Sequence, residues 1–500
     1  MSKSPYILAI DQGTSSTRAA LIDKNGIIID QESVEFKQIY PANGWVEHDP
    51  TEIWSSQLAT MRAALNNANI RVQDIACIGI TNQRETTVVW NRKTGQPIYN
   101  AIVWQDRRSE PVCAKLRQEG HDKLVQSKTG LVIDAYFSGT KLQWILDNVP
   151  QARDTAARGE LAFGTVDTWL IWNLTKGQVH ATDVSNASRT MLFNVHTNNW
   201  DSELMSMLHI DSKLMPVVQA SASDFGVIDS EWLGHPLAIG GVAGDQQSAL
   251  FGQACWREGQ AKNTYGTGCF MLMHTGHQFQ TSQNGLITTS AAQISHKPEF
   301  ALEGSVFIGG AVVQWLRDGL HAFKNSSDIE ALAQTVTDAD GVVVVPAFTG
   351  LGAPYWNADA RGTVVGITRG TTMAHFARAA LDSIAFQSTA LLQAMSKDAV
   401  QHGGTPVREL RVDGGACANN LLMQIQADLL GIPVIRPAVI ETTALGAAYL
   451  AGLHCGMFSN LEALEKHWKI DRVFEAQISR DEAQHRMLQW ESAVRQTAKL

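Results

Sequence analysis

Two similar turns, about half a chain apart, are the feature that most constrains the fold. The segment Asp11-Gln12-Gly13-Thr14 follows an apolar stretch at residues 6–10, and Tyr265-Gly266-Thr267-Gly268 lies between the stretches 261–264 and 270–273. Each predicts a strand, a tight turn and a second strand, because glycine readily adopts the backbone conformations of tight turns. The repetition indicates two similar domains that face each other across a cleft, with a boundary near residues 250–260.

Length and the order of elements indicate a multidomain α/β protein. A chain of 500 residues is too long for one hydrophobic core, so about two to four domains are expected. Short β-branched runs alternate with segments of helical periodicity, which is typical of the α/β class. Strands are expected at residues 6–10, 75–80, 86–90, 101–104, 342–346 and 410–412, and helices at residues 50–67, 376–395, 419–430 and 481–497.

Charge and cysteine content narrow the class of protein. A net charge of −9 disfavours a general nucleic-acid binder, whose domains are usually basic. No apolar run approaches the roughly 20 residues that cross a bilayer. The six cysteines are scattered without a CxxC pair, which fits a reducing cytosol better than a disulfide scaffold. We therefore expect a cytoplasmic protein without nucleic-acid partners or a membrane span.

The first turn is a candidate phosphate site. The common phosphate-binding patterns G-x-x-x-x-G-K-[ST] and G-x-G-x-x-G are absent, so an ATP site would have to be built differently. Thr14, Ser15 and Ser16 offer hydroxyl and N–H donors, and Arg18 offers a charged fork. Asp11 could hold Mg²⁺ through water, since Mg²⁺ keeps several waters and few carboxylates. The alternative is a hairpin with ordinary turn residues.

A single acid after an apolar strand is a candidate general base. The Gly/Ala-rich stretch 238–243 delivers Asp245 directly after Gly244. An acid at a strand end in a cleft suits the acceptance of a hydroxyl proton. The alternative is that Asp245 caps the helix predicted for residues 246–252.

Two further segments could recognise a nucleotide. Thr267 lies in the second Gly-Thr turn, which could also face phosphate. The small residues at 413–416 could let a flat nucleobase lie against backbone at Gly415, with Asn419 hydrogen bonding to it. The alternative for this second segment is a plain strand–turn–helix connection.

A polar pair and two aromatic residues could bind a polyol. Arg84 and Glu85 follow the strand at 75–80, and together they could bond the lone pairs and protons of hydroxyl groups. Trp104 and Phe270 could face the carbon atoms. The alternative is an exposed ion pair, which contributes little, beside two core aromatic residues.

Two long motifs resemble the signatures of the FGGY family of carbohydrate kinases. One is YFSGTKLQWILDN at residues 136–148, and the other runs from GTVVGI at 362–367 through His375 to AALD at 379–382. The resemblance covers roughly residues 6–470. It implies an α/β fold of two actin-like, ribonuclease H-type domains that flank a catalytic cleft. Residues 1–254 would bind glycerol and phosphate, and residues 255–500 would bind the nucleotide.

The resemblance also implies an activity and a set of site residues. Stretches at 44–50, 79–85, 344–356 and 444–452 resemble the family members that phosphorylate glycerol. We therefore expect transfer of the γ-phosphoryl group of ATP to glycerol, giving sn-glycerol 3-phosphate and ADP, with Asp11 near Mg²⁺ and Asp245 as base. The substrate contacts implied are Arg84, Glu85, Trp104, Tyr136, Asp245, Gln246 and Phe270. The nucleotide contacts implied are Thr14, Ser15, Ser16, Arg18, Thr267, Gly310, Gln314, Gly415 and Asn419.

The family resemblance also implies a homo-dimer or tetramer. Three alternative functions stay open at this point. Another family member could act on a pentulose such as xylulose, although the run at 82–85 and Trp104 favour glycerol. An actin-like or chaperone-like ATPase would share the phosphate turns but would need no polyol pocket. A nucleotide-binding scaffold without catalysis is the third, and the intact acids Asp11 and Asp245 argue against it.

Overall fold

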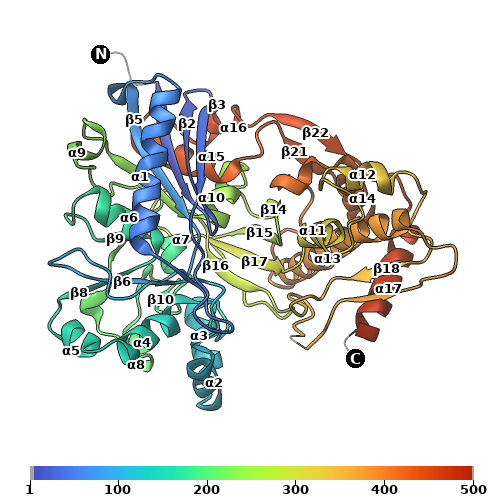
Figure 1. Cartoon of the computed structure of the whole chain (residues 1–500), viewed down its shortest axis with the longest axis horizontal. Coiled ribbons are helices and arrows are strands. Elements are labelled where there is room, and N and C mark those ends of the chain that lie inside the picture. Colours follow the sequence, from blue (N-terminus) through green and yellow to red (C-terminus); the bar gives the residue numbers. More distant parts are fainter. Residues whose placement is uncertain (1–4, 358, 498–500) are drawn as a thin grey trace.

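A computed structural model describes residues 5–357 and 359–497, which form two lobes, each built on one mixed sheet (Figure 1). The sheet of the first lobe has five strands in the order β13, β5, β1, β2, β3. The sheet of the second lobe has seven, in the order β16, β17, β15, β14, β20, β21, β22. In the first sheet the strands are β13 (Ile239–Gly244), β5 (Ile75–Asn82), β1 (Tyr6–Gln12), β2 (Ser16–Asp23) and β3 (Ile28–Glu35). In the second they are β16 (Ile287–Ser290), β17 (Phe300–Val306), β15 (Cys269–Gly276), β14 (Ala261–Tyr265), β20 (Leu410–Asp413), β21 (Val434–Pro437) and β22 (Ile470–Phe474).

The two sheets repeat one topology. In the first, β3, β2 and β1 are antiparallel neighbours, and β5 and β13 then run parallel to β1. In the second, β17, β15 and β14 are antiparallel, and β20 and β21 run parallel to β14. The β1–β2 and β14–β15 hairpins enclose the two Gly-Thr turns. The predicted pair of similar α/β domains is therefore confirmed.

Helices cover both faces of the first sheet. Ile7 and Ala9 of β1 face α10 (Asp245–Gly252) and α15 (Thr442–His454), while the alternate residues Leu8 and Ile10 face α1 (Pro50–Asn67) and α6 (Val166–Leu174). This alternation is the ordinary period of two along a strand. The helix α15 comes from the second half of the chain but packs on the sheet of the first lobe.

Glycine allows this close packing of α15. A Cβ on Gly79 would lie 2.3 Å from the carbonyl oxygen of Ala447, and one on Gly241 would lie 2.4 Å from the backbone nitrogen of Ala451. Both glycines are on strands that run beneath the helix. No other residue fits there without moving α15 away from the sheet.

Predicted elements are present with shifted ends. The first predicted helix matches α1, which Asp49 caps by accepting from the N–H of Thr51, whereas the helix predicted at 376–395 extends over α13 (Met373–Gln401). The strand predicted at 86–90 begins only at Val88, because Glu85 has a φ of 60° and the N–H of Thr86 donates to the Arg84 carbonyl. The other predicted elements correspond to β7 (Ala101–Ile102), β18 (Val343–Val345), β20, α14 (Asn420–Leu430) and α17 (Arg480–Thr497).

The remaining elements lie around these layers. The further helices are α2 (Glu110–Gln118), α3 (Asp122–Thr129), α4 (Ser138–Asn148), α5 (Ala152–Ala157), α7 (Val184–Ala187), α8 (Ser202–Met207), α9 (Ser230–Leu233), α11 (Ala311–Asp318), α12 (Asp328–Ala333) and α16 (Leu461–Glu465). The further strands are β4 (Glu47–His48), β6 (Val88–Asn91), β8 (Leu161–Gly164), β9 (Ala181–Asp183), β10 (Phe193–Asn194), β11 (Asn199–Trp200), β12 (Val217–Gln219) and β19 (Thr363–Val365). Among the described residues, none of these helices has the length and apolar character to span a membrane.

Candidate active site

The central strands of the first sheet bring the candidate catalytic residues together. In the parallel register Gln12 of β1 lies beside Asn82 of β5, and Asn82 lies beside Gly244 of β13. Ligands of such sheets bind at the carboxyl ends of parallel strands. Asp11, Arg84 and Asp245 therefore meet at one edge, although 234 residues separate the first from the last.

Asp245 has one carboxylate oxygen engaged and one available. Its Oδ1 accepts a 2.8 Å hydrogen bond from the backbone N–H of Gln246 and lies 3.2 Å from Arg84 Nε. No described residue donates a hydrogen bond to Oδ2, and the side chain is 32% exposed. The helix α10 begins at Asp245 itself, with Gly244 in the N-cap position. Asp245 is therefore not the cap of this helix, which differs from the capping alternative, and its side chain keeps an oxygen that can accept a proton.

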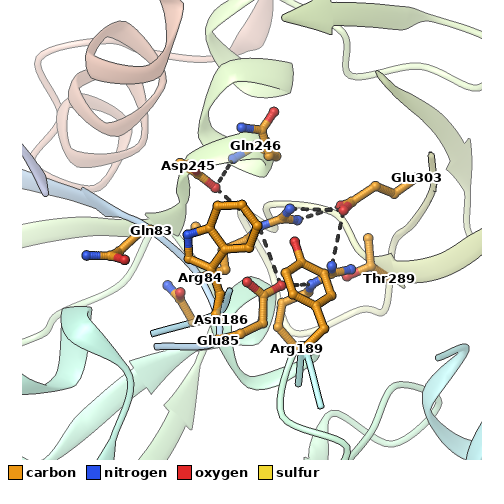
Figure 2. A network of polar contacts seen from close by, with 12 residues as sticks. Gln83, Arg84, Glu85, Asn186, Arg189, Asp245, Gln246, Thr289 and Glu303 are labelled. Carbon is orange, nitrogen blue, oxygen red and sulfur yellow. Dashed lines mark hydrogen bonds and ion pairs between the residues drawn. The ribbon is translucent and has the colours of Figure 1, made fainter. Parts of the chain in front are cut away.

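The pair Arg84 and Glu85 belongs to a buried network and is not an exposed ion pair (Figure 2). Arg84 donates two hydrogen bonds to Glu303, of 2.5 and 2.9 Å. Arg189 donates to Glu85 at 2.5 Å and to Glu303 at 3.1 Å. All four side chains are buried. Because Glu303 is on β17 of the second lobe, this network also joins the two lobes beneath the site.

The network fixes the charge of its acids. Burial alone raises the pKa of Glu303, but the guanidinium groups of Arg189 and Arg84 outweigh burial and lower that pKa to about 2. Burial raises the pKa of Glu85 above its usual range, with Arg189 and Arg84 opposing the shift. Glu303 is thus held as a carboxylate, which in turn holds Arg84 in place.

Replacing Glu303 by glutamine is expected to change the acid sensitivity of the protein. The pKa of Glu303 rises from about 2 in the folded state to 4.5 in the unfolded state, so its contribution to stability is present above pH 4.5 and falls as the pH drops toward 2. The difference in free energy of unfolding between wild type and Glu303→Gln should narrow by about 2 kcal/mol between pH 6 and pH 3. Urea denaturation across this range measures it, and a difference independent of pH would contradict the assignment.

Aromatic side chains from both lobes line an adjacent cavity. The Trp104 indole makes edge-on contacts with Tyr136, at 5.7 Å between ring centroids, and with Phe270 of β15, at 6.5 Å. Its Nε1–H donates to the Thr14 hydroxyl at 2.9 Å, which ties the aromatic wall to the first turn. These rings and Glu303 line a cavity of about 170 Å³. Its size and walls suit the carbon atoms of a small polyol.

Asp11 lies within electrostatic reach of Asp245. Burial, with the charges of Asp245 and Glu441, raises the pKa of Asp11 to about 6, although Arg18 opposes the shift. Arg18 Nη1 is 3.6 Å from Asp11 and 3.7 Å from Glu441. Within the described residues there is no group of three or more His, Cys, Asp or Glu side chains that could hold a metal. One buried carboxylate fits Mg²⁺ that arrives on nucleotide phosphates and keeps most of its waters.

A second, larger cavity lies in the second lobe. It measures about 460 Å³, within the usual range for cofactor sites. The β14–β15 turn forms one wall, where the N–H of Gly310 donates to the Gly266 carbonyl and that of Ala311 to the Thr267 carbonyl. Asn419 caps α14 by accepting from the N–H of Leu422. Five predicted nucleotide contacts line this cavity: Thr267, Gly310, Gln314, Gly415 and Asn419.

The predicted residues thus fall into three groups. The acceptor group surrounds Asp245 and the aromatic cavity, and the nucleotide group lines the larger cavity. The third group is the first turn, with Thr14, Ser15, Ser16 and Arg18, which lies beside Asp11 and outside the lining of the larger cavity. Sequence reasoning missed Arg189 and Glu303. A signal for Glu303 was present in the sequence, since it is an acid in a strand made otherwise of apolar and small residues. An acid in such a strand is expected to be buried, and buried acids almost always have a charged partner.

Two sheets of the same topology carry a carboxylate, a buried Arg–Glu network and a cavity large enough for a nucleotide. This fold and site define a two-domain phosphotransferase of the actin-like class. The model of the N-terminal domain of the FGGY family of carbohydrate kinases matches residues 6–252, and that of the C-terminal domain matches residues 261–455. The chain belongs to the FGGY family of carbohydrate kinases.

Individual relatives are similar over nearly the whole chain. A glycerol kinase of Acidovorax ebreus is 67% identical over 98% of this chain and 99% of its own length. The crystal structure of Plasmodium falciparum glycerol kinase with ADP matches with a TM-score of 0.91 at 36% identity, covering 98% of each chain. A ligand-bound xylulose kinase from Lactobacillus acidophilus matches with a TM-score of 0.85 at 22% identity, covering 98% of this chain and 97% of its own, which shows the shared fold.

Proposed function

We propose that this protein transfers the γ-phosphoryl group of ATP to glycerol, giving sn-glycerol 3-phosphate and ADP, as the entry step of glycerol catabolism. The observation that carries the proposal is Oδ2 of Asp245, to which no described residue donates a hydrogen bond. Arg84 links Asp245 to Glu303, which lines a small cavity with aromatic walls. The glycerol kinases that resemble the chain at 67% identity support the choice of acceptor, and the ADP complex of the Plasmodium relative supports the choice of nucleotide.

The site residues supply positioning and one proton transfer. In the proposed reaction, Arg84 and Glu85 bond glycerol hydroxyl groups, with Tyr136 and Gln246, and Trp104 and Phe270 face its carbons. The reacting hydroxyl gives its proton to Asp245 Oδ2, its oxygen bonds the γ-phosphorus, and the bond to the bridging oxygen breaks to leave ADP. Phosphoryl transfer needs mainly such alignment and charge neutralisation. The nucleotide would lie in the larger cavity, along Thr267, Gly310, Gln314, Gly415 and Asn419, with Thr14, Ser15, Ser16 and Arg18 at its phosphates.

Several finer points belong to the same proposal. Mg²⁺ would be held by Asp11 and would neutralise phosphate charge when bound. The division into residues 1–254 and 255–500 and a homo-dimer or tetramer follow the family resemblance. A cytoplasmic location follows from the scattered cysteines without a CxxC pair. Size-exclusion chromatography with light scattering tests the oligomer.

An ADP-release assay tests the function. With MgATP, glycerol should support turnover at least about 100-fold faster than xylulose or no acceptor, because a cavity of this size leaves the two further carbons and hydroxyl groups of xylulose without room or hydrogen-bond partners. Release of glycerol 3-phosphate in equal amount to ADP confirms transfer. Turnover with xylulose but not with glycerol would show that the acceptor is a pentulose. ADP release at the same rate without any acceptor would favour an ATPase.

A further inference from the structure

A buried lysine of the second lobe contacts the acceptor site of the first. Lys262 is on β14, has no exposed surface, and donates a 2.5 Å hydrogen bond to Oε1 of Gln246 on α10. Its Nζ also donates to the hydroxyl of Thr264 at 2.7 Å and to the carbonyl of Phe270 at 3.3 Å. The three N–H groups of the ammonium therefore match three acceptors.

These three acceptors are all neutral. Lys262 forms no ion pair with any carboxylate in residues 5–357 and 359–497, although the charges of Asp413 and Asp245 act on it from further away. A buried charge without a close partner is costly. A neutral side chain could fill this space at a lower desolvation free energy. Packing alone therefore does not explain an ammonium group at this position.

The contact decides which way the Gln246 amide points. An ammonium group can only donate, so the amide must turn its Oε1 toward Lys262. The amide Nε2 then points away from Lys262, and no described residue accepts a hydrogen bond from it. Gln246 directly follows the proposed base Asp245, and its backbone N–H already donates to Asp245 Oδ1. The side-chain Nε2 is therefore a second donor on the residue next to the base. Figure 2 shows Asp245 and Gln246 side by side above Arg84.

We propose that Lys262 is a positioning residue, which orients the Gln246 amide so that it presents only a donor to the acceptor substrate. This inference rests on the proposed function. A hydroxyl that gives its proton to Asp245 retains lone pairs, and a fixed N–H donor can hold its oxygen in line for attack. Because β14 leads into the turn that carries Thr267, the orientation of Gln246 depends on how the nucleotide lobe sits against the acceptor lobe.

A double-mutant cycle separates this role from a purely structural one. The variants are Lys262→Met, which keeps the length of the side chain without donors, Gln246→Met, and the double variant. Lys262→Met should raise the KM for glycerol about tenfold, the cost of one lost hydrogen bond to substrate, and leave the KM for ATP within twofold. In the Gln246→Met background the same change should alter the KM for glycerol less than twofold, because the residue through which Lys262 acts is gone.

A matched control removes another Lys262 contact without touching Gln246. Thr264→Val should leave the KM for glycerol within twofold. Additive effects in the cycle, or a Lys262→Met variant that is less stable with an unchanged KM, would overturn the inference. If Lys262→Met is insoluble, Lys262→Gln takes its place. Its amide can both donate to and accept from Gln246, so it no longer fixes one orientation, and it should raise the KM for glycerol about threefold alone and less than twofold in the Gln246→Met background. Wild-type turnover of glycerol is measured separately, so its absence would reject the proposed function, whereas an additive cycle with an active wild type would reject only this inference.

Discussion

Replacing Asp245 by asparagine should reduce kcat with glycerol by on the order of 10³-fold, the usual worth of a general base. Asparagine can still accept the Gln246 N–H that Asp245 now binds through Oδ1, but its amide cannot take a proton. The side chain is partly exposed, so the fold should be little affected. Steady-state ADP release at saturating glycerol and MgATP measures kcat, and calorimetry with an ATP analogue should give a Kd within threefold of wild type.

The matching variant at Asp11 serves as the control. Asp11→Asn should lower activity at limiting Mg²⁺ and recover in part when Mg²⁺ is raised, because Mg²⁺ can still bind through the phosphates. Asp245→Asn should not respond to Mg²⁺. An unchanged kcat for Asp245→Asn would remove this residue from the role of base, and recovery with Mg²⁺ would make it a metal ligand instead.

Replacing Arg189 by methionine should cost about 3–5 kcal/mol of unfolding free energy. Methionine fills much of the space but leaves two buried carboxylates, Glu85 and Glu303, without one of their cations. The KM for glycerol should also rise, because the position of Glu85 depends on Arg189. Urea denaturation at neutral pH measures the stability, and the ADP-release assay measures KM.

Arg107 offers a matched comparison for Arg189. It also pairs with two carboxylates, Glu110 at 2.7 Å and Asp134 at 2.6 Å, but its side chain is 49% exposed. Arg107→Met should therefore cost less than about 1 kcal/mol. Equal losses for the two variants would show that burial of the Arg189 network adds nothing to stability.

Local patterns in the sequence predicted much of the fold and some of the site. The two hairpins followed from their Gly-Thr turns, and α1 followed from an apolar period with Asp49 and Pro50 at its start. Asp245 stood out because it directly follows an apolar strand. Such features depend on neighbouring residues, so one sequence is enough to find them. The roles of the individual site residues stay predictions until the variants are measured.

Long-range pairing explains what the sequence could not predict. Arg84 and Glu303 are 219 residues apart, and the residues around either one do not predict that the two will pair. An Arg beside a Glu is compatible both with an exposed pair and with a buried network, and only the tertiary fold distinguishes them. The same holds for α15, whose small residues contact Gly79 and Gly241 only after two distant segments have met.

The position of α15 limits how the gene can be divided. A fragment that ended at residue 254 would lack this helix, and Ile7, Ala9, Ala20 and Ile22 of its sheet would lose the part of their apolar cover that α15 provides. Such a product should aggregate when expressed alone. Recombination in evolution, or in the laboratory, should therefore exchange this enzyme as an intact unit, despite the internal likeness of its halves.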